Sequence, residues 1–186
     1  MAQHRIAVLV GSLRRDSYNR TLANAVKALG PSHFTFDDVK IDDLPLYNQD
    51  DDDNPAASVR RVKDAISAAQ GVLFVTPEYN RSVSGVLKNA IDHASRPYGQ
   101  SAWQGKPAGI IGASIGAPGT SMAQQHLRNI LAYLDAPTLG QPEVFLHVKD
   151  GFFDDKGQIA DADTKAFLQQ WMDAYVGWVE AHASKG

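Results

Sequence analysis

Short strand-like runs alternate with segments of helical spacing along the chain, and this alternation restricts the fold more than any other feature. The strand-like runs cover residues 6–10, 34–41, 72–76, 108–113 and 143–148. Apolar residues recur with helical spacing over residues 18–29, 59–69, 86–94, 122–134 and 167–178. Such alternation predicts parallel strands joined by crossover helices that pack on both faces of the sheet. The runs at 6–10 and 72–76 are almost entirely apolar, as in strands that are buried on both sides. We therefore expect an α/β fold with a five-stranded parallel sheet.

Composition narrows the class of protein. The chain has 186 residues, of which 44% are hydrophobic and 21% charged, as in a soluble globular protein. No repeat or linker divides it, so we expect a single domain over residues 1–186. The net charge of −3 argues against nucleic acid or a membrane surface as a partner, and no apolar run approaches the ~20 residues of a membrane span. The absence of cysteine excludes disulfides and thiol catalysis and fits a cytoplasmic location.

The loop after the first predicted strand has the chemistry of a phosphate site. Gly11 allows a tight turn, Ser12 and Ser17 offer hydroxyl groups, and Arg14 offers positive charge. The helix that begins near Asn19 directs its free amides and its positive dipole end into this loop. Neither a Walker motif nor G-x-G-x-x-G is present, so the loop suits a terminal phosphate better than a dinucleotide. The alternative is an ordinary helix N-cap with solvated arginines.

The loop after the third predicted strand, residues 77–84, has the chemistry of a ring-binding site. Tyr79 can cover a flat ring, and Asn80 with nearby backbone amides can bind polar atoms on its edge. In open α/β sheets, ligands bind at the carboxyl ends of strands, and this loop occupies such a position. Together with the phosphate loop, it predicts a flavin nucleotide.

Two charged residues of this loop have more than one interpretation. Glu78 can accept hydrogen bonds from backbone amides or pair with Lys88, and we expect a structural role rather than acid–base catalysis. Arg81 can bind an anionic substrate or a neighbouring subunit, or simply be solvated.

A third loop, residues 114–119, follows the fourth predicted strand. Its two glycines and one proline permit close approach of backbone to a ligand, although an ordinary turn is the alternative. The run of aspartates at 50–53 lacks the pattern of a calcium loop, and no H-E-x-x-H motif occurs, so we expect no metal site. No G-x-S-x-G nucleophile motif occurs either.

These motifs resemble the NADPH-dependent FMN reductase family of the flavodoxin-like fold, and most closely its bacterial chromate and quinone reductases and azoreductases. The resemblance rests on Gly11-Ser12-Leu13-Arg14 with Ser17 and Asn19, and on Thr76-Pro77-Glu78-Tyr79-Asn80 followed by residues 87–92. It implies an FMN phosphate held by Ser12, Arg14, Ser17 and Asn19. It implies an isoalloxazine ring lined by Pro77, Glu78, Tyr79, Asn80 and Ser82, with Ser114 and Gly116 in a third flavin loop.

The resemblance also implies features beyond the cofactor site. Members of the family are usually homodimers or homotetramers, and Arg128 matches a position of the tetramer contact. Arg81 stands where many relatives carry tyrosine. We consider Arg81 and Arg96 as candidate contacts for an anionic substrate.

The function that follows is an FMN-dependent NAD(P)H oxidoreductase. Its electron acceptor would be a small molecule: a quinone, an azo compound, a metal oxyanion such as chromate, or free flavin. Because the cofactor carries the chemistry, no catalytic side chain is required. One alternative is a flavodoxin-like electron carrier without reductase activity, which the arginines of the first loop and the mild charge disfavour. The other is a flavin-free enzyme that acts on a nucleotide or sugar phosphate.

Overall fold

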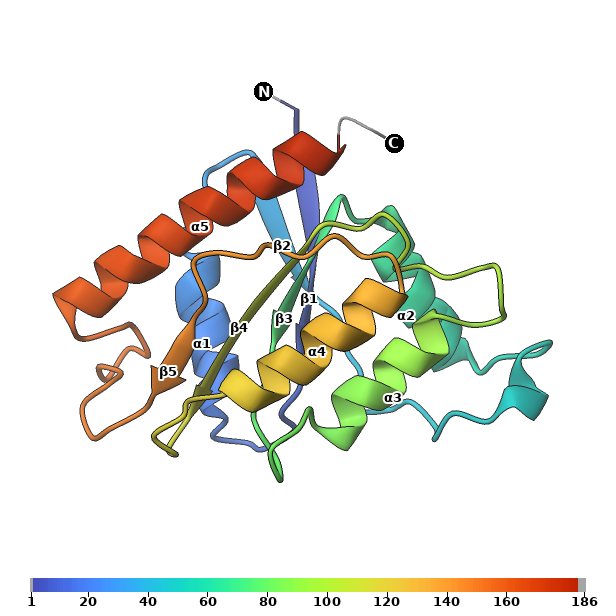
Figure 1. The fold of residues 1–186 in the computed structure, drawn as a ribbon, viewed down its shortest axis with the longest axis horizontal. Coiled ribbons are helices and arrows are strands. Elements are labelled where there is room, and N and C mark those ends of the chain that lie inside the picture. Colours follow the sequence, from blue (N-terminus) through green and yellow to red (C-terminus); the bar gives the residue numbers. More distant parts are fainter. Residues whose placement is uncertain (1, 184–186) are drawn as a thin grey trace.

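The computed structural model describes residues 2–183 and contains one five-stranded parallel sheet (Figure 1). In spatial order the strands are β2 (Phe34–Asp38), β1 (His4–Val10), β3 (Gly71–Val75), β4 (Ala108–Ser114) and β5 (Phe145–His147). The helices are α1 (Tyr18–Lys27), α2 (Ala57–Ala68), α3 (Gly85–Ala94), α4 (Ser121–Tyr133) and α5 (Ala162–Ala183), with a short 3₁₀ turn at Gln49–Asp51. The order 2-1-3-4-5 is that of flavodoxin-like folds and confirms the predicted fold class.

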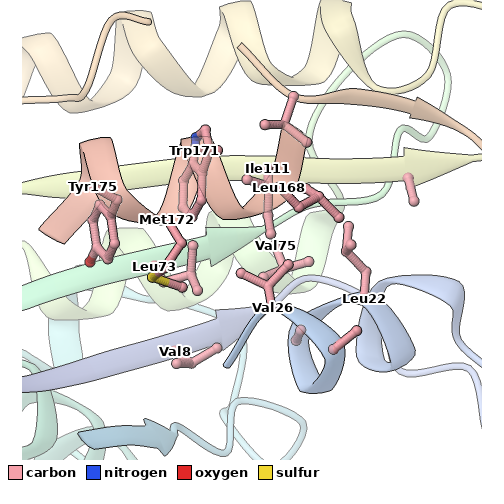
Figure 2. Packing of buried hydrophobic residues seen from close by; sticks show 14 of the residues in the cluster. Val8, Leu22, Val26, Leu73, Val75, Ile111, Leu168, Trp171, Met172 and Tyr175 are labelled. Carbon is pink, nitrogen blue, oxygen red and sulfur yellow. The ribbon is translucent and has the colours of Figure 1, made fainter. Parts of the chain in front are cut away.

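The sheet is buried on both faces because successive strand residues enter two different cores. Val8 and Val10 belong to the core under α1 and α5, whereas Ala7 and Leu9 belong to the core under α2, α3 and α4. Figure 2 shows side chains of α5 and α1 packed on the first of these faces, around Leu73. Each large aliphatic side chain buried in this way contributes about 1.5–3 kcal/mol. The burial of the strands on both faces thus confirms the layered arrangement that was predicted from the continuous apolar runs.

The parallel strands bring three loops to one edge of the sheet. Val10 pairs with Val75, so β1 and β3 end at the same level. Val75 pairs with Ile111, and β4 continues from there in the same direction to Ser114. The hydroxyl of Ser84, at the start of α3, donates to the carbonyl of Gly11 at 2.6 Å and ties two of these loops together. The predicted phosphate, ring and third loops are therefore neighbours at the carboxyl edge.

Some element boundaries differ from the prediction. The strand-like pattern extended to Ile41, but β2 ends at Asp38. The amide of Val39 still donates to the carbonyl of Val8 at 2.9 Å, and the side chains of Val39 and Ile41 are buried in the core under α2 and α3. The edge strand β5 has only three residues, and α5 extends well beyond its predicted limits at both ends. Among the described residues, no helix is long and apolar enough to span a membrane.

Candidate functional site

Backbone amides at the start of α1 form the first part of the site. Ser17 caps the helix, and its hydroxyl accepts a hydrogen bond from the amide of Arg20 at 3.2 Å. The amides of Tyr18 and Asn19 lie in the first turn, where a helix has no carbonyl partner for its N–H groups. Because the positive end of the helix dipole lies at the same place, this turn fits a phosphate group.

Asn19 makes a side-chain contact with β4 that could not be predicted from the sequence. Its side chain is only 4% exposed and bonds twice to the backbone of Ala113 in β4, as donor and as acceptor, at 2.9 Å each. The amide side chain thus fastens α1 to β4. Its contribution to a phosphate site would come from the backbone N–H, and its predicted role in FMN binding stays a prediction.

Positive charge gathers around the outer side of the first loop. A cavity of about 320 Å³ there is lined by loop residues 12–15 and by residues near the end of β2. Arg14, Arg15 and Arg20 line it together with Lys40, against the carboxylates of Asp38 and Asp42. The guanidinium of Arg14 also lies 5.3 Å from the ring centre of Tyr18. The loop therefore offers an anion both backbone amides and exposed cationic side chains.

The second loop is a tight turn at Tyr79–Ser82. The backbones of Tyr79 and Ser82 exchange two hydrogen bonds of 3.0 and 3.1 Å. Asn80 and Arg81 between them have φ values of 51° and 64°, the left-handed conformation required by this type of turn. Tyr79 is 49% exposed and can cover a flat ligand. Backbone strain of this kind gathers at functional sites.

Glu78 fastens this turn to α4. Its carboxylate is 8% exposed and accepts hydrogen bonds from the amides of Met122 and Ala123 at 3.0 and 3.1 Å. The structural role expected for Glu78 is confirmed, with backbone amides as its partners. The alternative pairing with Lys88 is wrong, because Lys88 binds Asp92 one helical turn away at 2.8 Å. A carboxylate at a helix N-terminus is favoured by the dipole.

Two further contacts join the turn to α4. The guanidinium of Arg81 lies 3.4 Å from the sulfur of Met122 and 3.7 Å from the carboxylate of Glu78. The hydroxyl of Ser82 lies 2.9 Å from Nδ1 of His126. Met122 follows the apolar spacing of its helix, and nothing in the sequence near His126 predicts a role for it. The spacing of four between Met122 and His126, which places both on one face of α4, was the only available signal.

The third loop lies beside the N-terminus of α4. Ser114 accepts a hydrogen bond from the amide of Gly116 at 3.1 Å, and Ile115 is largely exposed at the loop tip. A cavity of about 260 Å³ separates Ile115 and Tyr18 from the segment that follows β5, residues 148–153. The two phenylalanines of that segment, Phe152 and Phe153, line the cavity, and the sequence had not marked them as site residues.

The remaining predicted residues lie outside these three loops. Arg96 lines a cavity of about 280 Å³ together with residues of α2, α3 and the 45–56 segment, none of which belongs to the three loops. Arg128 donates to the carbonyl of Leu139 at 2.8 Å and lies 3.6 Å from the carboxylate of Glu143, and its burial lowers its pKa. It lines a cavity with Gln70 and Pro107, at the amino ends of β3 and β4. Within residues 2–183, no group of three or more His, Asp or Glu residues is placed to hold a metal ion.

The residues present fit FMN in their chemistry. A helix N-terminus with hydroxyl and guanidinium groups suits the phosphate, and a rigid turn with an exposed aromatic ring suits the isoalloxazine. Both parts lie at the carboxyl edge of the sheet, at β1 and β3, where flavodoxin-like folds bind their ligand.

Comparisons with known proteins agree with this chemistry. A family model described as NADPH-dependent FMN reductase matches residues 4–151. A 2-hydroxy-1,4-benzoquinone reductase from a Burkholderia species is 54% identical over 94% of this chain and 96% of its own length. A quinone reductase from Pseudomonas putida is 48% identical over 94% of each chain. Among solved structures, the flavoenzyme NAD(P)H:(acceptor) oxidoreductase FerB from Paracoccus denitrificans is 42% identical, with a TM-score of 0.92 over 96% of this chain and 98% of that one.

Proposed function

Because the chain belongs to the NADPH-dependent FMN reductase family and is an FMN-dependent oxidoreductase with NAD(P)H as donor, we propose that quinones are its electron acceptors. The observation that supports this proposal most directly is the match over nearly the full length to two quinone-reducing relatives. The open carboxyl edge, with Tyr79 exposed in the turn and Ile115 exposed in the third loop, suits a flat apolar acceptor.

The site residues have distinct roles in this proposal. The amides of Tyr18 and Asn19, with Ser12, Arg14 and Ser17, hold the phosphate of FMN. The turn at Tyr79–Ser82 with Pro77 and the third loop with Ser114 and Gly116 hold the ring, while Glu78 keeps that turn against α4. Bound FMN supplies the redox chemistry that links NAD(P)H to the acceptor. The protein binds, orients and partly shields both reactants.

Further acceptors belong to the same proposal. Azo compounds, chromate and free flavin can accept electrons at the same exposed position. Arg81 at the tip of the turn would favour anionic acceptors, and Arg96 is a second candidate contact. A flavodoxin-like carrier would instead deliver electrons to a protein and show almost no oxidation of NAD(P)H with small acceptors.

The decisive experiment measures cofactor content and turnover together. The purified protein is expected to be yellow or to bind FMN in titration, and to oxidise NADH or NADPH when 1,4-benzoquinone is added. Ferricyanide, an azo dye and chromate complete the panel of acceptors. A protein that binds no FMN, or one that binds FMN but shows no turnover with any acceptor, would contradict the proposal.

We also propose that residues 1–186 act as one domain within a cytoplasmic homodimer or homotetramer. Arg128 is the candidate contact between dimers. Light scattering on the wild-type protein and on Arg128→Ala is expected to show a smaller assembly for the variant. An unchanged mass would assign Arg128 to its contacts with Leu139 and Glu143 alone.

A further inference from the structure

The turn at Tyr79–Ser82 carries a hydrogen bond that its attachment to α4 does not need. Glu78 already fastens the turn through two amides of α4, and Arg81 contacts Met122. Ser82 adds a contact of 2.9 Å between its hydroxyl and Nδ1 of His126. The backbone of Ser82 is fixed by both hydrogen bonds of the turn, and the contact with His126 sets the orientation of its hydroxyl. A fixed hydroxyl bonded to an imidazole is an arrangement that can transfer a proton.

Reduction of a quinone needs such a proton. The balanced reaction converts NAD(P)H, a quinone and one proton into NAD(P)⁺ and a hydroquinone. NAD(P)H supplies two electrons and one hydrogen as a hydride equivalent. The second proton must come from water or from a protein group beside the acceptor. Histidine is the side chain whose ordinary pKa lies closest to neutral pH, and it serves this role most often.

We propose that Ser82 and His126 form a proton relay that delivers this second proton to the reduced quinone. This inference rests on the proposed function. The Ser82 O–H bond breaks as an O–H bond forms on the anionic oxygen of the hydroquinone. In the same step, Nδ1 of protonated His126 passes its proton to the Ser82 oxygen, so that the hydroxyl is restored and no serine alkoxide forms. Because His126 is exposed on α4, water returns its proton before the next turnover.

The charges around the relay suit an anionic product. The guanidinium of Arg81 precedes Ser82 in the turn and is exposed, so it can stabilise the negative oxygen before protonation. The carboxylate of Glu78 faces the amides of α4 and is partly balanced by Arg81. Further along α4, Arg128 pairs with Glu143. His126 has no carboxylate within salt-bridge distance in the described residues, so no ion pair competes with its hydrogen bond to Ser82.

The test compares acceptors that differ in their need for a proton. Quinone reduction consumes a proton, whereas ferricyanide accepts one electron and no proton. In the FMN-loaded enzyme, Ser82→Ala and His126→Asn are expected to lower kcat for 1,4-benzoquinone by at least about tenfold. This is less than the roughly 10²–10⁴-fold effect of general acid catalysis, because water can supply the proton in the variants. The kcat of His126→Asn for ferricyanide should stay within about twofold of wild type. Because Ser82 also belongs to the turn that is proposed to hold the flavin ring, Ser82→Ala is judged by the ratio of its quinone rate to its ferricyanide rate, which should fall by about the same factor as in His126→Asn. Rates are normalised to bound flavin, so that loss of cofactor is not mistaken for loss of the relay.

The pH profile separates a relay from a structural contact. Wild-type quinone turnover should fall as rising pH removes the proton from the imidazole, and this dependence should disappear in His126→Asn. His126→Gln provides a second variant if the asparagine variant folds poorly, and His182→Asn, at the end of α5, is the matched control. An equal decrease of kcat with quinone and with ferricyanide would mean that the contact between Ser82 and His126 only holds the turn against α4, and it would overturn the relay. Unchanged quinone turnover in all variants would also overturn the relay.

An independent measurement does not use turnover. The chemical shifts of the imidazole nitrogens of His126 are compared by NMR at one pH in the wild-type protein and in Ser82→Ala. The signal of Nδ1 is expected to move in the variant more than the signal of Nε2, because Nδ1 has lost its hydroxyl partner. Unchanged shifts of both nitrogens would mean that the hydrogen bond does not form in solution and would refute the relay. A wild-type protein that fails to bind FMN or to reduce quinone refutes the proposed function instead.

Discussion

Glu78 combines a negative charge with a nearly buried position beside the proposed ring site. Removal of its carboxylate leaves the amides of Met122 and Ala123 without acceptors. We expect Glu78→Ala to lower the free energy of unfolding by about 1–3 kcal/mol, the cost of unsatisfied buried donors. Glu78→Gln, which keeps one acceptor oxygen, should lose less. Urea unfolding of the FMN-free protein measures both.

The matched control for Glu78 is Glu180→Gln. Glu180 is a more exposed glutamate that lies 3.0 Å from His33, and exposed ion pairs contribute little to stability. The control should change the free energy of unfolding by less than about 1 kcal/mol. Equal stability of Glu78→Ala and wild type would mean that water or a rearranged turn replaces the carboxylate.

Asn19 offers a second test at this scale, because its side chain joins α1 to β4. Asn19→Ala removes both hydrogen bonds to Ala113 and should cost about 1–3 kcal/mol. The melting temperature should fall by about 2–4 °C for each kcal/mol. Asn129→Ala, at an exposed position on α4, is the control and should melt like wild type. Equal melting of all three proteins would contradict the role of Asn19 as a fastening between the two elements.

At the scale of elements, the packing of β4 against the start of α4 sets the place of the third loop. A Cβ on Gly112 would overlap both the hydroxyl of Thr120 and the backbone carbonyl oxygen of Thr76. Because a backbone atom cannot move cheaply, Gly112→Ala should destabilise the protein by about 1–3 kcal/mol or more. It should also weaken FMN binding, since β3 and β4 must separate at the edge that carries the second and third loops.

Thermal unfolding and FMN titration of Gly112→Ala measure these two effects. Gly140→Ala is the control, because a Cβ there meets no atom within 4 Å. A Gly112→Ala protein with normal stability and normal FMN affinity would show that the sheet edge is more adaptable than its packing indicates.

Element types followed from local patterns, but element ends did not. The spacing of Leu22 and Val26 marked α1 because a helix repeats every 3.6 residues and buries one face. The end of β2 was misplaced because Val39 and Ile41 are buried in the core although they lie beyond the last residue of the strand. An alternating pattern indicates that a residue is buried, but it does not indicate which element covers that residue.

At the scale of the whole molecule, FMN should stabilise the fold that it completes. A ligand that binds only the folded state adds about 2.7 kcal/mol to stability at a free concentration of 100 Kd. The melting temperature of the FMN-free protein should therefore rise with added FMN. Riboflavin, which lacks the phosphate, should give a smaller rise at equal concentration, because it cannot use the amides at the start of α1. Equal effects of the two flavins would contradict the assignment of the phosphate loop.

The sequence by itself determined the layered α/β architecture and the positions of the three loops. The spacing of apolar residues is enough to predict the architecture, because a helix or strand that is buried on one or both faces carries apolar residues at regular positions along its sequence. The motifs at residues 11–19 and 76–92 also led to the family, since they carry their chemistry within short segments.

Only the tertiary structure decided how the polar side chains are used. The bond between Asn19 and Ala113 spans 94 residues, and the bond between Ser82 and His126 spans 44. Hydrogen bonds are directional and short, so a change of a few ångströms in the packing of two elements makes or breaks them. Hydrophobic burial is non-directional and tolerates such changes. The fold could therefore be predicted from patterns along the chain, whereas the partners of Asn19, Glu78 and Ser82 depended on how α1, β4 and α4 pack together.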